Sequence, residues 1–373
     1  MKYEIKLSGL PLGVLATSVK KGEVDRVQLL SRVLSDEPDF AHRMDIVTGI
    51  INQLPKEPEI LCSTIDNFLA VIQPDKKCMV YVNGLDRIAL VHKKGAGSAG
   101  QEVYDDQIVD VKAMEFEGVE IPEDAGVIMV LSYGWRKVLF YDLIPLFGEK
   151  LKRPFDIRQE FGQCQNLLFF HHLHNITKRQ YDVLFSQRWF PFTGLRHATI
   201  KSMLLHVDSG GNCDDLLDTM SAEVKAGLPE WIKSWKSRAS FNNHMELIAH
   251  AADEFMQEDY KSSTGLLYPK IEGVLRSIGA NLGDSRPSQP ELSKIALKES
   301  GISKRTFSAL LPWEFSEYLG KVYFAGFDSG ETPPMSRNTV AHGVAPAEGF
   351  SEKESVIAFL ILHQIFYHQF KPA

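Results

Sequence analysis

The sequence predicts an α+β protein in which a mixed domain containing a sheet is followed by helices. Between residues 78 and 143, short runs rich in β-branched and aromatic residues are separated by turn-forming residues, which is typical of strands. After residue 150, apolar residues recur with helical spacing. The 373 residues are enough for about one to three domains, and their composition is that of an ordinary globular protein.

An N-terminal α+β domain with an antiparallel or mixed sheet is expected over residues 1–150. Its first residues, Met1–Ser8, alternate enough for an edge strand. Helical periodicity is present at 24–34, 40–54 and 60–72. Strands are expected at 78–82, 87–92, 108–114, 127–133 and 138–143, with the last two forming a hairpin that turns near Gly134. The sequence assigns this domain no function beyond sensing a signal or positioning a substrate.

A helical and relatively basic region is expected over residues 151–240. The predicted helices are 163–174, 178–186, 195–207, 213–225 and 231–236, with Gly194, Gly210 and Pro229 as breaks between them. Residues 136–240 carry 15 Lys and Arg against 11 Asp and Glu, although the whole chain has a net charge of −7. An RNA is therefore expected to rest on this region, and an ordinary solvated surface is the alternative.

A helical bundle is expected over residues 241–373. Two amphipathic runs, 245–257 and 260–278, come first, and the polar stretch 283–290 is expected to be a loop. Ser336 is placed to cap a short helix that starts at Arg337 and is stopped by Gly343. The last, apolar helix follows a capping box formed by Ser351 and Glu354.

The short predicted helix carries Arg337, Asn338 and His342, a set suited to phosphodiester chemistry. Arginine binds phosphate through a planar fork of donors, and histidine exchanges protons near neutral pH. Arg337 lies in the first turn, where free N–H groups favour anions. Because Asn338 and His342 are four residues apart, they share one face of the helix. These residues indicate a site for RNA cleavage.

The pattern Arg337-Asn338-x-x-x-His342 resembles the R-x4-H motif of HEPN domains, which are small helical bundles found in many prokaryotic toxins and antiviral ribonucleases. The resemblance covers residues 240–373. It implies a metal-independent endoribonuclease, without a cofactor, in which the RNA 2′-hydroxyl attacks the adjacent phosphorus and leaves a 2′,3′-cyclic phosphate. It also implies a homodimer with a composite active site, and a role as a toxin or antiviral effector with an antitoxin partner or a phage-derived trigger.

The resemblance gives each residue of the motif a role. His342 acts as general base or acid, and Arg337 stabilises the charge that develops on the phosphorane oxygens. Asn338 orients His342 or donates to a phosphate oxygen. Glu272, on an earlier helix, is placed to form a salt bridge with Arg337 and set its orientation. A solvated glutamate on the helix face, beside Lys270 and Arg276, is the alternative.

Two other functions remain open at this point. One is a non-catalytic, HEPN-like protein that dimerises or binds nucleotide or RNA. The other is an enzyme whose site lies in residues 1–240. His171-His172-Leu173-His174 lacks further ligands at a metal-binding spacing, and Gly95–Gly100 fits a nucleotide-binding glycine pattern without the helix that should follow it. The polar start and four widely spaced cysteines favour a cytoplasmic protein with free thiols, and no run is long enough to cross a membrane.

Overall fold

The computed structural model describes residues 1–9, 20–22, 27–56, 60–95, 97–98, 100–147, 153–284, 286–301, 307–327 and 335–370. The chain forms two compact units. Unit 1 contains residues 1–91 and 111–171, and unit 2 contains residues 92–110 and 172–373. The predicted α+β fold is confirmed. The units do not follow the boundaries expected at residues 150 and 240, because the middle helices pack with the C-terminal bundle.

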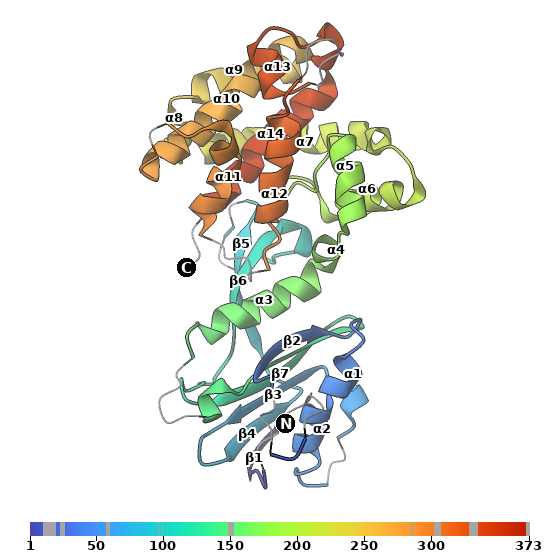
Figure 1. Cartoon of the computed structure of the whole chain (residues 1–373), viewed down its shortest axis with the longest axis vertical. Helices are drawn as coiled ribbons and strands as arrows, with labels where there is room; N and C mark the ends of the chain where they lie inside the picture. The colour runs from blue at the N-terminus through green and yellow to red at the C-terminus, as the bar shows by residue number, and fades with distance from the viewer. Residues whose placement is uncertain are drawn as a thin grey trace. The chain divides into compact units, whose positions relative to one another are not determined.

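Unit 1 is built on a six-stranded antiparallel sheet with the strand order β1-β4-β3-β7-β8-β2 (Figure 1). The expected edge strand at the start of the chain is confirmed as β1, which pairs only with β4 among the described strands. The expected hairpin is also present, with Tyr133 opposite Arg136 and Gly134 in the turn at φ +59°. The strands are β1 Lys2–Lys6, β2 Leu30–Leu34, β3 Asn67–Ile72, β4 Lys77–Val82, β7 Gly126–Tyr133 and β8 Arg136–Asp142.

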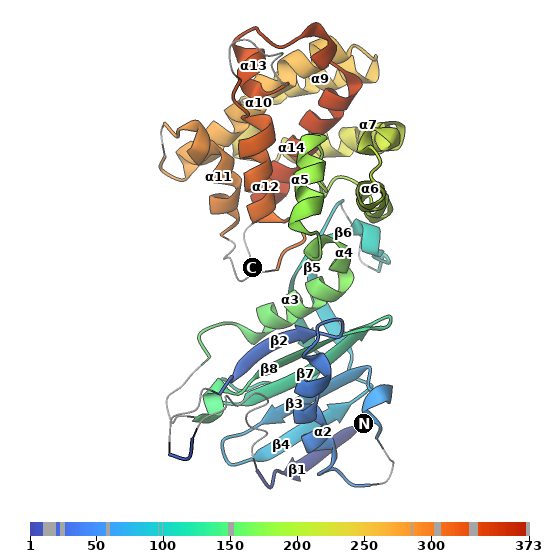
Figure 2. The same cartoon turned by 45° about the vertical axis from the view of Figure 1, so that its right-hand side comes forward.

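Helices cover both faces of this sheet (Figures 1 and 2). Helices α1 (Phe40–Arg43) and α2 (Asp45–Ile51) lie on one face, where Ile50 packs against Phe68 and its neighbours. Helix α3 (Ile157–Phe169) lies on the other face, where Phe161 packs against Leu69 and Phe140. Because both faces are buried, the central strands β3 and β7 carry continuous apolar runs, at residues 68–72 and 127–131, instead of alternating apolar and polar residues.

Two sequence predictions in this unit were wrong, and burial on both faces explains the first of them. Residues 60–72 were expected to be a helix, but they contain the short turn η1 (Cys62–Thr64) and strand β3. A short run in which nearly every residue is apolar is compatible with a buried helix and with a buried strand. The helix expected at 24–34 is also wrong, since Leu30–Leu34 forms strand β2; residues 23–26 lie outside the described part of the chain.

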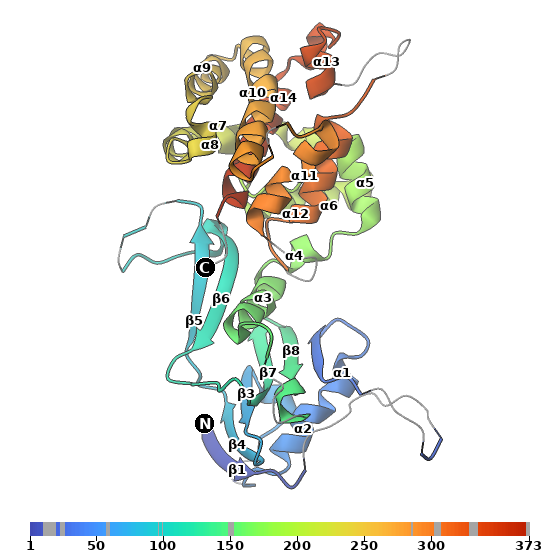
Figure 3. The same cartoon turned by 60° about the vertical axis from the view of Figure 1, so that its left-hand side comes forward.

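Strands β5 (Arg87–Lys93) and β6 (Ile108–Phe116) form a separate two-stranded ribbon that contributes residues to both units (Figure 3). Within unit 1, α3 lies directly against β6. Asn166 exchanges two hydrogen bonds of 2.9 Å with the backbone of Val111. Gly162 is needed at this contact, because an added Cβ would lie 2.8 Å from the Cα of Ala113.

Unit 2 is helical, and α14 (Glu352–His368) forms its centre. Every residue of α14 from Glu354 onward is buried, with α7, α10 and α11 packed against it (Figure 2). The other helices are α4 His171–His174 (residues 172–174 belonging to unit 2), α5 Lys178–Ser186, α6 His197–Ser209, α7 Leu217–Trp235, α8 Ala239–Asn242, α9 Met245–Met256, α10 Tyr260–Asn281, α11 Gln289–Ser300, α12 Pro312–Tyr318 and α13 Arg337–Ala341. The break expected at Pro229 is wrong, because Pro229 lies inside the continuous helix α7.

A buried ion pair joins α14 to the rest of unit 2. Arg188, which follows α5, donates from Nε and Nη2 to the carboxylate of Glu354 at 2.7 and 2.9 Å. The Tyr268 hydroxyl of α10 also donates to this carboxylate. The expected capping box is therefore only half present: Ser351 accepts a hydrogen bond from the Glu354 N–H, but the Glu354 carboxylate turns to Arg188.

The four cysteines are all free, and burial raises the pKa of the Cys78 and Cys164 thiols to about 12. Among the residues that the structure describes, no helix is long and apolar enough to span a membrane.

His363 makes the stability of unit 2 depend on pH. It is buried and stacked on Trp231 with ring centroids 3.9 Å apart, and burial holds its pKa well below the usual 6.5. Below about pH 6.5 the unfolded chain therefore binds a proton that the folded chain does not, so stability falls as the pH falls. A His363→Phe variant should remove up to about 1.4 kcal/mol of this loss per pH unit.

The measurement is urea unfolding followed by tryptophan fluorescence at about pH 7.5 and 5.5. The control is His250→Phe, since His250 is an exposed histidine of α9. An equal pH dependence in wild type and His363→Phe would contradict the prediction.

Candidate active site

The short helix α13 begins where the sequence predicts. Ser336 is its N-cap, and its hydroxyl accepts a hydrogen bond of 3.2 Å from the Thr339 N–H. The Thr339 hydroxyl accepts in turn from the Ser336 N–H at 2.9 Å, so the two residues form a capping box. Gly343 follows the helix at φ +68°, a left-handed conformation that ends it. Helix α13 packs against α10, which carries Glu272 (Figure 3).

Arg337 forms the expected ion pair with Glu272 through its Nε. The Glu272 side chain is 6% exposed, whereas the Arg337 side chain is 24% exposed. Arg276, one turn along α10, binds the same carboxylate at 2.7 Å. The alternative of a solvated glutamate is therefore wrong. One buried carboxylate holds two guanidinium groups, and their charges are not fully neutralised.

Asn338 attaches α13 to the segment that follows α12. This segment begins with the π-helical turn Leu319–Tyr323. The Asn338 amide donates to the carbonyls of Phe324 and Ala325 at 3.0 and 3.3 Å, and its oxygen accepts from Gln289 at 2.6 Å. No described hydrogen bond joins the Asn338 amide to the His342 ring. The contacts thus give Asn338 a structural role, and the expectation that it orients His342 is not met.

His342 ends α13 as its C-cap, and its N–H donates to the Asn338 carbonyl at 3.0 Å. The side chain is exposed and lies edge-on to Phe327, with ring centroids 5.8 Å apart. As expected from their spacing, Asn338 and His342 face the same segment, residues 324–327. The imidazole nitrogens have no hydrogen-bond partner among the described residues, so a substrate can reach them.

The histidines at 171–174 do not share a site. His171 binds Asp36 at 2.6 Å, His172 contacts the ring of His197, and His174 contacts the ring of Phe307. In the described part of the chain, no group of three or more His, Cys, Asp or Glu residues is arranged to hold a metal ion.

Sequence reasoning missed a half-buried cluster of titratable groups around Lys94. Its amine donates to the Leu195 carbonyl at 2.8 Å, and burial lowers its pKa to about 8. Burial and the charge of Lys94 also lower the pKa of His197 to about 4. These residues are about a hundred positions apart in the sequence, so no local pattern could have indicated that they meet.

Removing the Glu272 carboxylate should weaken the attachment of α13. Glu272→Ala leaves Arg337 without its buried partner, and we expect the free energy of unfolding to fall by about 1–3 kcal/mol. In a double-mutant cycle with Arg337→Ala, the coupling energy should be about 0.5–3 kcal/mol. Urea unfolding of the two single variants and the double variant gives this value. The control is Glu230→Ala, which removes an exposed carboxylate of α7. A coupling energy near zero would show that the ion pair does not hold the helix.

Comparisons of the chain with protein-family models, curated proteins and solved structures found no match.

Proposed function

We propose that the protein is a metal-independent endoribonuclease of the HEPN type. The observation that supports this most directly is the arrangement on α13. Arg337 is oriented by the buried Glu272, and an exposed His342 follows at the end of the same short helix. A fixed guanidinium and an accessible imidazole are the two groups that the proposed phosphodiester cleavage uses.

In the proposed reaction, the 2′-oxygen of the RNA forms a bond to the adjacent phosphorus, and the bond from phosphorus to the 5′-oxygen breaks. One imidazole takes the proton from the 2′-hydroxyl, and a protonated imidazole gives a proton to the leaving 5′-oxygen. The products are a 2′,3′-cyclic phosphate and a 5′-hydroxyl. Two copies of His342, one from each subunit of a homodimer, provide the acid and the base.

Glu272 makes Arg337 a better phosphate ligand in two ways. It restricts the orientation of the guanidinium, so that less side-chain entropy is lost when a phosphate binds. Because Arg276 binds the same carboxylate, one negative charge faces two positive charges, and the site keeps a net attraction for an anion.

The alternative is a non-catalytic, HEPN-like interaction protein. The contacts of Asn338 favour it, because this amide is used to hold α13 in place instead of facing a substrate.

An enzyme with its site in the first 240 residues is the third option. Unit 1 contains a cavity that Asp156 lines, but hydrogen bonds from Arg158 lower the pKa of Asp156, a direction that does not suit a general acid.

The proposed setting is the cytoplasm, where RNA cleavage would halt growth in a toxin or antiviral response. An antitoxin or a phage-derived trigger would then regulate the homodimer. These partners follow from the family resemblance and from the chemistry proposed for Arg337 and His342.

We expect purified protein to cleave cellular RNA in the presence of EDTA. His342→Ala and Arg337→Ala should each lower the rate by about 10²–10³-fold, since they remove the proton-transfer group and the charge that stabilises the transition state. Cleavage is followed by gel electrophoresis, and product ends are mapped for the cyclic phosphate.

The matched controls are His250→Ala and Arg179→Ala, which remove an exposed histidine and an exposed arginine of unit 2. Because His342 is exposed, His342→Ala should change the free energy of unfolding by less than about 0.5 kcal/mol, so a lost activity would not reflect unfolding. Equal cleavage by all variants would place the chemistry elsewhere. No cleavage by the folded wild-type dimer, even with lysate from infected cells, would favour the interaction protein.

A further inference from the structure

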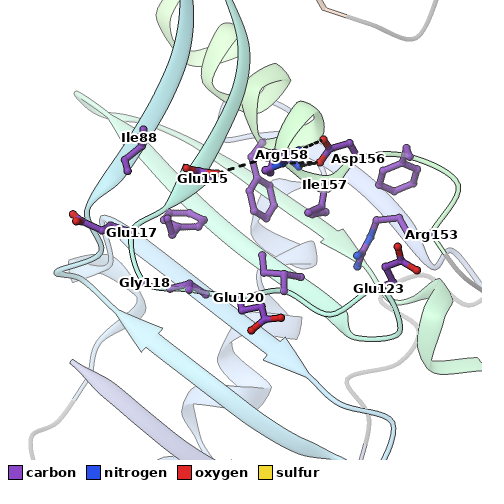
Figure 4. A pocket seen from close by; sticks show the side chains of 15 residues that line it. Ile88, Glu115, Glu117, Gly118, Glu120, Glu123, Arg153, Asp156, Ile157 and Arg158 are labelled. Atoms are coloured by element: carbon purple, nitrogen blue, oxygen red, sulfur yellow. Dashed lines mark hydrogen bonds and ion pairs between the residues drawn. The ribbon is translucent and has the colours of Figure 1, made fainter. Parts of the chain in front are cut away.

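Unit 1 contains a cavity of about 780 Å³ between β6, the loop that follows it and the start of α3 (Figure 4). This volume is in the range of known ligand pockets. The floor and walls are largely apolar and are formed by Ile88, Phe116, Ile121, Phe155, Ile157 and Phe161.

The rim of this cavity is acidic. Its two arginines are already paired: Arg153 donates to the buried Asp142 at 2.6 Å, and Arg158 binds Asp156 at 2.9 Å. Glu117 and Glu120 are exposed and have no cationic partner among the described residues. Figure 4 shows Glu117 at the edge of the cavity, on the side away from Arg153, and Glu120 below the middle of the cavity. The uncompensated charge therefore favours a cationic ligand.

The apolar surface continues from the cavity along β5. Ile88 lines the cavity, and Leu90 lies two residues further on the same face of the strand. The two residues are 42% and 49% exposed. Among the described strands, β5 pairs only with β6, so its outer edge is open. A ligand that covers both residues extends beyond the cavity, and this favours a peptide over a small molecule.

We propose that this surface binds an extended basic segment of a partner protein. An aromatic or aliphatic side chain of the segment fills the cavity. Its lysines or arginines lie beside Glu117 and Glu120, and its next apolar side chain covers Leu90. This binding is independent of the chemistry proposed for α13, because every residue involved belongs to unit 1.

The test is selection of random peptides of about ten residues, displayed on yeast, with the 373-residue chain. Peptides rich in lysine or arginine around an apolar residue should be enriched. Their dissociation constants are then measured by fluorescence polarisation.

Glu117→Lys with Glu120→Lys should weaken binding about tenfold or more, and Leu90→Ser should also weaken it. The milder pair Glu117→Gln with Glu120→Gln should give an intermediate loss, and high salt should weaken wild-type binding.

The matched control is Glu4→Lys with Asp66→Lys, which makes the same charge change at exposed positions of unit 1 outside the cavity. This variant should bind like wild type. No enrichment, or equal binding by all variants, would overturn the proposal. The proposal would also be overturned if the glutamate variants weakened peptide binding but Leu90→Ser did not. The ligand would then be a small cation confined to the cavity.

Discussion

The structure of unit 2 depends on the buried pair between Arg188 and Glu354. Removing one partner of such a pair leaves an uncompensated charge and costs about 3–5 kcal/mol. The Tyr268 hydroxyl shares the Glu354 carboxylate, so α10 and α14 are held in a fixed relation. Helix α10 also carries Glu272, which binds Arg337. The position of the proposed catalytic arginine therefore rests on an ion pair formed by residues outside the motif.

Features encoded within a few neighbouring residues could be predicted from the sequence. The start of α13 depends on Ser336 and its end on Gly343, and both bounds agree with the structure. The hairpin around Gly134 is a similar case. Features decided by packing could not be predicted. Strand β3 is buried on both faces, so its apolar pattern does not distinguish strand from helix, and Pro229 is tolerated inside α7.

The same distinction applies to the candidate site. The spacing of Arg337 and His342 and the presence of Glu272 on an earlier helix could be recognised in the sequence. The hydrogen bonds of Asn338 could not be predicted, because its partners Phe324 and Gln289 are brought to it by the turn after α12 and by the start of α11. Glu354 shows the same difficulty: it fits a capping box locally, but the arginine that binds it is 166 residues away in the sequence.

Because the ribbon of β5 and β6 is divided between the two units, neither unit is encoded by one continuous stretch of the gene. The chain leaves unit 1 after Val91 and returns at Val111, and the residues between them belong to unit 2. Asp110, for example, accepts hydrogen bonds from Ser308 and Ala309 within unit 2. No single recombination point separates one complete unit from the other. Exchanging one complete unit for another therefore takes at least two crossovers, one on each side of residues 92–110.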